Sequence, residues 1–144
     1  MVDWNSRAFT VAEAAALAGL HRAALDNVIS RASVFADLFS EKRGYRRWFS
    51  PRDITILRLA YELERGGRHW STAIAQAFEL LTSPPPSDAV LMVPINSVSH
   101  LSGTVIKERD AEVRNVDQST ALYPIGRIAD GIVRACQELE VTNV

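Results

Sequence analysis

Residues 42–52 read Lys-Arg-Gly-Tyr-Arg-Arg-Trp-Phe-Ser-Pro-Arg, which gathers five cations and three aromatic side chains around one glycine. The nearest acidic residues, Glu41 and Asp53, flank this run, so the positive charge is confined to one short segment. Glycine favours tight turns, and aromatic residues favour short strands on either side of such a turn. The pattern therefore predicts a basic β-hairpin around Arg43-Gly44, whose charge suits contact with a polyanion.

This hairpin leads directly into the start of a helix. We expect its two strands near residues 38–42 and 45–49. Ser50 then serves as the N-cap, Pro51 occupies the first helical position, and Asp53 stands at the third position. A hairpin that is joined to a helix in this way should be held in a fixed orientation.

Two short helices are expected before the hairpin. Thr10 and Glu13 have the spacing of a capping box, which opens an alanine-rich helix that Gly19 should end. A second helix is expected over residues 22–29 or 22–31, with its apolar residues on one buried face. Two short helices joined by a Gly-Leu turn form a helix-turn-helix.

Further helices and a connector follow the hairpin. Residues 51–65 carry the apolar spacing of a third helix, and the paired glycines 66–67 should end it. A fourth helix is expected to begin with Ser71 as its N-cap. Residues 83–87 read Ser-Pro-Pro-Pro-Ser, which is incompatible with the interior of a helix or a sheet and predicts a stiff, extended linker.

The linker divides the chain into residues 1–82 and residues 88–144, which we expect to be separate units. The formal net charge of the whole chain is −1, but residues 1–83 carry 11 basic against 9 acidic residues, and residues 84–144 carry 5 against 8. Only the first unit therefore has the cationic footprint that contact with nucleic acid needs.

Sequence patterns in the second unit are mixed. Residues 89–95 form a short apolar run that predicts a buried strand. Residues 97–109 fit either a helix or a second strand, and we favour a helix, whereas residues 111–116 alternate as a strand does. Residues 125–139 carry the apolar stripe of an amphipathic helix.

Composition excludes several classes of protein. The 144 residues, 47% of them hydrophobic, suit one globular domain or two small ones. Cys136 is the single cysteine, so an internal disulfide and a cysteine-based zinc cluster are both excluded. We find neither a leader pattern nor a run of about 20 apolar residues, and therefore expect a cytoplasmic protein without membrane contact.

Catalytic motifs are not apparent in the sequence. The three histidines, His21, His69 and His100, are scattered, and no metal-binding, phosphate-loop or nucleophile-elbow motif includes them. A lone histidine near Ser102 is common in proteins without a catalytic triad, and Cys136 is expected to be a buried apolar thiol. We therefore expect a binding protein that is not an enzyme, with no catalytic residues, no cofactor and no metal.

The order of the elements in the first unit resembles that of the MerR-like winged helix-turn-helix proteins. The most specific match is residues 43–54, Arg-Gly-Tyr-Arg-Arg-Trp-Phe-Ser-Pro-Arg-Asp-Ile, which resemble the wing and the following helix start of that family. Residues 11–20 resemble its first helix and turn, and the similarity covers about residues 9–81. The resemblance implies that the second helix enters the major groove of DNA while the wing contacts the backbone beside it. The expected fold is thus α+β and mainly helical, a winged helix-turn-helix followed by a small mixed α/β C-terminal segment.

Two elements supply the candidate contacts to double-stranded DNA. On the second helix Arg22 can bond guanine and Asn27 can bond adenine, because their side chains offer the donor and acceptor sets that these bases need. The alternative is that both are merely solvated. The full set of candidate DNA-binding residues is His21, Arg22, Ala24 and Asn27 on the second helix and Lys42, Arg43, Tyr45, Arg46 and Arg47 in the wing, where the alternative is a solubilising hairpin.

Self-association is expected through the C-terminal segment. Its last helix has a wide apolar face, which pairing with a second copy would bury, although the helix can also fold over the strands of its own chain. A two-fold dimer would present two recognition helices about one DNA turn apart. We therefore predict a sequence-specific DNA-binding transcriptional regulator that forms a homodimer. The alternatives are an architectural, excisionase-like DNA-bending protein and a protein-interaction adaptor with a winged-helix fold.

Overall fold

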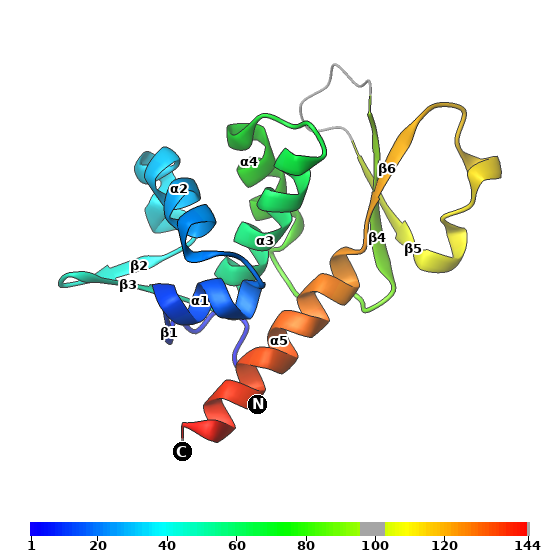
Figure 1. Ribbon diagram of the computed structural model, residues 1–144. Coiled ribbons are helices and arrows are strands. Elements are labelled where there is room, and N and C mark those ends of the chain that lie inside the picture. Colours follow the sequence, from blue (N-terminus) through cyan, green and yellow to red (C-terminus); the bar gives the residue numbers. More distant parts are fainter. Residues whose placement is uncertain (96–102, 144) are drawn as a thin grey trace.

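The computed structural model describes residues 1–95 and 103–143 and shows the expected α+β class, with more helix than strand. Two small antiparallel sheets lie at opposite ends of the molecule, and helices α3 and α4 lie between them (Figure 1). The first sheet has the order β1-β3-β2, and the second has the order β5-β4-β6.

The N-terminal helices begin and end where the capping residues predict. Strand β1 (Phe9–Thr10) leads into α1 (Val11–Ala18), where the Thr10 hydroxyl accepts from the Glu13 amide and the Glu13 carboxylate accepts from the Thr10 amide. Gly19 ends α1 in the left-handed conformation, with φ of 69°. Helix α2 (Arg22–Arg31) follows after a short turn and confirms the longer of the two expected ranges.

The basic hairpin is present, but its turn lies one residue later than the sequence suggested. A 3₁₀ helix, η1 (Ser33–Leu38), precedes β2 (Glu41–Arg43) and β3 (Arg46–Phe49), so residue 38 belongs to a helical turn and not to a strand. Arg43 pairs with Arg46, which leaves Gly44 and Tyr45 as the two turn residues. Of these two residues, only Gly44 has a positive φ, which is 63°. A two-residue hairpin turn that has glycine in its first position requires this conformation. We refer to the β2–β3 hairpin as the wing.

Helix α3 (Pro51–Arg65) confirms the predicted capping box. The Asp53 amide donates to the Ser50 hydroxyl, and the Asp53 carboxylate accepts from the Ser50 amide at 2.8 Å. The same carboxylate accepts from Arg7 Nε at 2.9 Å, so the N-terminal segment is tied to the start of this helix. The paired glycines end α3 as expected, with the Gly66 amide donating to the Glu62 carbonyl.

Helix α4 (Trp70–Leu80) begins earlier than predicted, because its N-cap is His69 and not Ser71. His69 has the extended backbone of a cap, and its Nδ1 accepts from the Ser71 amide. A ring nitrogen here performs the task that we assigned to a hydroxyl, which places Ser71 inside the helix.

The C-terminal sheet corrects two expectations. Strand β4 (Ala89–Pro94) confirms the buried strand, but Thr104–Lys107 forms strand β5 and not the helix that we favoured. The earlier part of that expected helix, residues 97–102, lies outside the described residues. The strand expected over 111–116 is absent, because this segment contains a 3₁₀ helix, η3 (Val113–Asn115), and the third strand is β6 (Thr120–Tyr123). A second 3₁₀ turn, η2 (Glu108–Asp110), follows β5.

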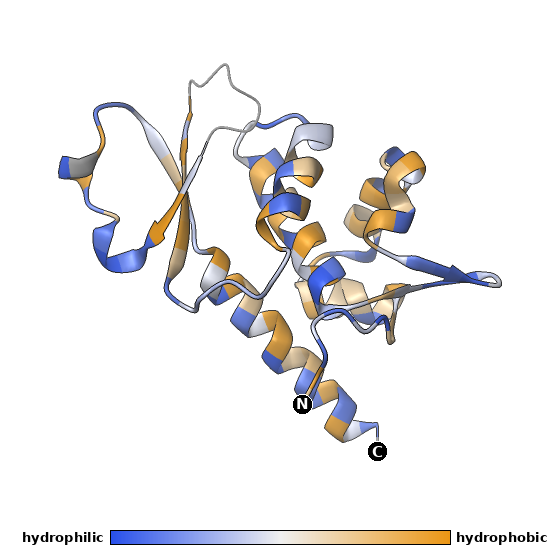
Figure 2. Ribbon diagram, turned by 180° about the vertical axis from the view of Figure 1, so that it is seen from behind, coloured by the Kyte–Doolittle hydropathy of each residue, from blue (hydrophilic) through white to orange (hydrophobic). Residues whose placement is uncertain are grey.

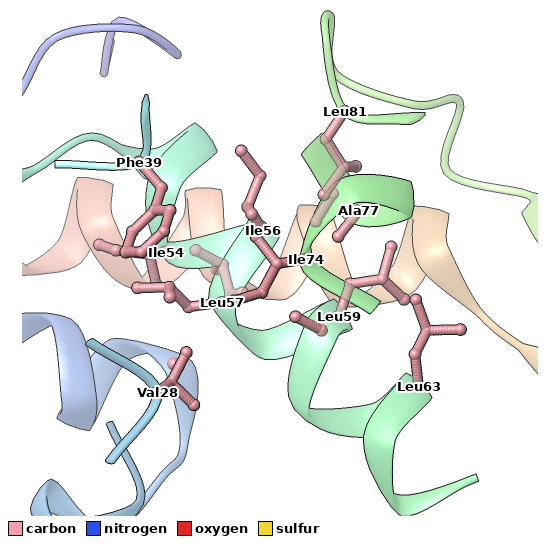
Figure 3. Packing of buried hydrophobic residues seen from close by; sticks show 14 of the residues in the cluster. Val28, Phe39, Ile54, Ile56, Leu57, Leu59, Leu63, Ile74, Ala77 and Leu81 are labelled. Atoms are coloured by element: carbon pink, nitrogen blue, oxygen red, sulfur yellow. The ribbon is translucent and has the colours of Figure 1, made fainter. Parts of the chain in front are cut away.

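Helix α5 (Ile125–Thr142) carries the predicted apolar stripe and packs against α3, α1 and β4. Its residues Ala129, Ile132 and Cys136 are buried in the same hydrophobic cluster as residues of α1, α3 and α4. Figure 3 shows part of this cluster, in which side chains of α3 meet those of α4 and Phe39. The apolar face of α5 is therefore covered within the chain.

Across residues 1–95 and 103–143, no helix combines the length and the apolar content needed to cross a membrane.

Candidate nucleic-acid interface

A groove of about 320 Å³ lies where the starts of α1 and α2 meet the wing. It brings together four of the predicted contact residues, one of which lies more than 20 positions before the other three in the sequence. These four are Arg22 of α2 and Tyr45, Arg46 and Arg47 of the wing, and residues 10–12 at the start of α1 complete the lining. The groove thus joins an arginine at the start of the predicted reading helix to the basic wing.

The start of α1 was not among the predicted contact residues. Helix N-termini favour anions because their first amides point outward and the helix dipole is positive there. Residues 10–12 occupy this position and line the groove. The sequence signal that could have identified them is the capping box itself, since it locates a helix start a short distance before a basic hairpin.

Three of the candidate arginines form ion pairs with carboxylates. The closest N–O distances are 3.1 Å for Arg22 and Asp26, 2.7 Å for Arg43 and Glu41, and 3.3 Å for Arg47 and Asp37. All three carboxylates are largely exposed. Such exposed pairs contribute little free energy, so a phosphate can replace the carboxylate at small cost.

Two of these arginines also brace the wing. Arg43 donates to the Arg7 carbonyl at 3.0 Å, and its guanidinium lies 5.5 Å from the centroid of the Trp48 ring. Arg47 donates to the Ser40 hydroxyl at 3.0 Å. The hydrogen bond from Arg43 lowers the pKa of the Glu41 carboxyl, which therefore stays ionised near neutral pH.

The remaining wing residues face solvent. Tyr45 is fully exposed at the tip, and Lys42 and Arg46 are exposed and form no ion pair within the described part of the chain. Figure 2 shows the wing projecting from the body as a largely hydrophilic hairpin. These three side chains are therefore the ones most available to a ligand.

Asn27 and Ala24 lie on a different side of α2. They border a second hollow, of about 280 Å³, whose other walls include Arg31 of α2 and Arg65 of α3. His21 is exposed at the N-cap of α2. The structure therefore groups Arg22 with the wing but places Asn27 beside α3.

Two cations in this second hollow were missed by the sequence reasoning. Arg31 forms a two-pronged pair with the Glu64 carboxylate, at 2.7 and 3.1 Å, and Arg65 lies 5.6 Å from the ring centroid of Tyr61. Nothing in the local sequence indicates that these side chains share a surface with Asn27, because their proximity depends on how α2 packs on α3.

Catalytic and metal-binding alternatives were also considered. Within residues 1–95 and 103–143, no three potential ligands of the His, Cys, Asp and Glu types come together to hold a metal ion. Burial raises the pKa of the Cys136 thiol to about 12, so this buried thiol stays protonated near neutral pH. A thiol in that state is a poor nucleophile.

A comparison with known protein families and with curated proteins finds no match to this chain. A functional assignment must therefore come from the chemistry of these surfaces.

Proposed function

We propose that this chain is a sequence-specific DNA-binding regulator of the winged helix-turn-helix type. The observation that carries the proposal is the groove in which Arg22 and the wing residues Tyr45, Arg46 and Arg47 meet the start of α1. Its lining holds three guanidinium groups and the start of α1, which suit a phosphate backbone. Two of these guanidinium groups, those of Arg22 and Arg47, pair with the exposed carboxylates of Asp26 and Asp37, which a phosphate would replace. The Glu13 carboxylate already accepts from the Thr10 amide, so the arginines carry most of the argument. The succession of the capped helix α1, the helix α2, the wing and the capped helix α3 also supports the winged helix-turn-helix description.

In the proposed complex, the wing provides affinity and α2 provides selectivity. Arg46 and Lys42 are free to contact phosphates, and each phosphate that they neutralise releases counterions. Tyr45 can donate its hydroxyl proton to a phosphate oxygen. Arg22 at the start of α2 and Asn27 five residues later reach base edges from two sides of that helix. Guanine and adenine are the bases that their side chains match.

The proposed regulator acts as a homodimer. The apolar face of α5 does not support this part of the proposal, because the chain itself covers it. The surface left for this contact is the exposed face of α5, where Arg127 and Glu138 lie on one stripe three helical turns apart and Arg127 also pairs with Glu108 of its own chain. In an antiparallel pair of α5 helices each Arg127 would face the Glu138 of the other copy.

The proposal is tested by measuring duplex affinity as a function of salt for the wild type and for Arg46→Ala. Several phosphate contacts should make the affinity of the wild type fall steeply with salt, and loss of one contact should reduce the slope of log K against log salt by about 1. Arg109→Ala is the matched control, because Arg109 is an exposed arginine on η2, outside the groove.

An affinity that hardly changes with salt, or equal losses of duplex affinity for Arg46→Ala and Arg109→Ala, would contradict the proposal and favour a protein-interaction adaptor.

Footprinting separates the regulator from the architectural protein. A regulator should protect discrete promoter sites, whereas an architectural protein should protect phased arrays.

A further inference from the structure

A second surface of the N-terminal part has no role in the proposed DNA contact. It is an apolar groove of about 260 Å³ between η1 and α4, which we call the η1–α4 groove. Its lining is Phe35, Leu38, Phe39, Ser71, Ile74, Ala75, Phe78 and Glu79. The side chains that form it come from segments more than 30 residues apart, so the groove is a product of the fold.

The η1–α4 groove exposes an unusual amount of apolar surface. Phe35 is 48% exposed and Leu38 is 50% exposed, and the neighbouring Val34 is 87% exposed. The base of the groove is well packed, because Phe39 and Ile74 are buried and belong to the core cluster shown in Figure 3. A contiguous exposed apolar patch on a firm base is typical of an interaction surface.

Two exposed carboxylates lie at this groove, although one of them, Asp37, already pairs with Arg47 at 3.3 Å, and the Arg52 guanidinium lies 4.6 Å from the ring centroid of the lining residue Phe78. Glu79 lines the groove, and Asp37 lies on η1 between two of the lining residues with its side chain 87% exposed. No lysine or arginine lines the groove in the part of the chain that the structure describes. A partner that fills it should therefore present a large apolar or aromatic side chain flanked by cations.

The same chain carries such an element at the tip of the wing. Tyr45 is fully exposed there, and Lys42 and Arg46 beside it form no ion pair with any described residue. We propose that the wing tip of a second copy inserts Tyr45 into the η1–α4 groove, where Lys42 and Arg46 face Glu79 and Asp37. Charge complementarity and the match between an aromatic knob and an apolar hollow select this occupant.

The contact has to form between molecules. Figures 1 and 2 both show the tip of the wing pointing away from α4, and Arg47 fixes the base of the wing to η1 through Asp37. An interface in which a wing meets a groove is head-to-tail, because the two surfaces are different. Each copy then offers one wing and one groove.

The association should be weak and sensitive to salt. Eight residues line the groove, whereas a standard interface uses about 20 to 30 residues on each side. Cation–carboxylate contacts at an exposed rim are screened by salt. The inference does not depend on DNA binding, but the two activities share the wing, so duplex DNA should compete if both occur.

Sedimentation velocity over a range of protein concentrations tests the proposal. The wild type should associate as concentration rises, and Tyr45→Ala and Leu38→Asp should each weaken that association roughly tenfold or more, as loss of a central contact does. An equimolar mixture of the two variants should associate again, because one supplies an intact groove and the other an intact wing. Glu79→Lys provides a second groove variant that alters only an exposed side chain.

Val113→Asp is the matched control, since Val113 is 87% exposed on η3, far along the chain from both surfaces. Far-UV circular dichroism checks that each variant is folded. Because the proposed α5 dimer would persist in both variants, the species that report on the wing are those larger than a dimer. Absence of such species in the wild type at high concentration, their persistence at wild-type levels in either variant, or a mixture that fails to form them would each overturn the proposal. Single-site DNA affinity, measured with Leu38→Asp, reports separately on the proposed function and should equal that of the wild type.

Discussion

At the scale of single residues, Asp53 links the N-terminal segment to the helix that supports the wing. Asp53 is 1% exposed, and its carboxylate accepts from the Ser50 amide and from Arg7 Nε. Asp53→Ala removes the acceptor of the Ser50 amide, which is half of the capping box, and leaves the Arg7 guanidinium without its carboxylate partner, so we expect the free energy of unfolding to fall by about 2 to 4 kcal/mol. Urea denaturation followed by circular dichroism measures this loss.

The control for Asp53 is Asp26→Ala. Asp26 is also paired with an arginine, Arg22, but both side chains are more than half exposed. Its removal should cost less than about 1 kcal/mol. Equal losses in the two variants would show that burial of the Asp53 cap contributes nothing to stability.

Arg22 and Asn27 can be tested for base reading by comparing a selected DNA site with random duplex. Each alanine variant should lose about 1 to 3 kcal/mol of affinity on the selected site and much less on random DNA. Asn27→Ala should also leave the salt dependence unchanged, since Asn27 is uncharged. Ser30→Ala on the same exposed surface of α2 is the control, and losses of the same size on both DNAs would reject a base-reading role.

At the scale of elements, the geometry of the wing depends on the backbone of Gly44. A Cβ at this position meets no atom within 4 Å, but φ is +63°. Gly44→Ala therefore costs only backbone strain, about 1 kcal/mol, and should lower both the stability of the fold and the affinity for DNA.

The same substitution at position 131, Gly131→Ala, should have the opposite effect on stability. Gly131 lies inside α5 with helical backbone, and a Cβ there also meets no atom within 4 Å. Alanine should raise the free energy of unfolding by roughly 0.5 to 1 kcal/mol, because it restricts the unfolded chain. Thermal and chemical denaturation measure the free energy of unfolding of both variants. If Gly44→Ala and Gly131→Ala changed it in the same direction, this account would be contradicted.

The elements that the sequence predicted well are those with local signals. Capping boxes at Thr10 and Ser50 and the left-handed Gly19 depend on neighbouring residues, so their helices were located closely. Residues 104–107 carry a local strand signal that we underweighted, the three β-branched residues Thr104, Val105 and Ile106, and this segment forms β5 by pairing with β4. Tertiary pairing decides these ambiguous segments.

The candidate site was predictable in composition but not in arrangement. The wing residues were found from their charge, whereas the grouping of Arg22 with the start of α1 depends on packing. Gly66 is a further case, because a Cβ there would lie 1.9 Å from the Tyr123 hydroxyl. This glycine ends α3, as the sequence indicated, and also leaves room for the C-terminal sheet, which the sequence did not indicate.

At the scale of the whole molecule, helix α5 joins the two parts that the proline linker separates in the sequence. The buried side of α5 packs on α1 and α3, and its other side is exposed and charged. Sequence periodicity identified the apolar stripe but could not say which surface would cover it. Any pairing of two copies through α5 must therefore use its exposed charges.

A charge exchange on α5 tests the proposed homodimer. In an antiparallel pair, Glu138→Arg would place two arginines opposite each other at both ends of the contact, and the dimer should weaken roughly tenfold. Adding Arg127→Glu to the same chain restores opposite charges and should restore the dimer, although Arg127 also loses its pair with Glu108. Sedimentation equilibrium in the Tyr45→Ala background isolates this contact from association through the wing.

Glu140→Arg is the control for this exchange, because Glu140 is exposed on α5 but lies well around the helix from the stripe of Arg127 and Glu138. The double variant shows whether Glu138→Arg acts through misfolding, because a folding defect would weaken the double variant as well. Glu140→Arg changes the net charge by the same amount as Glu138→Arg and therefore controls for that effect. Dimers that form equally in the single and double variants would show that α5 does not carry the two-fold contact. The proposed DNA contacts would then have to be made by single copies, and the footprint should be one half-site without a symmetric partner.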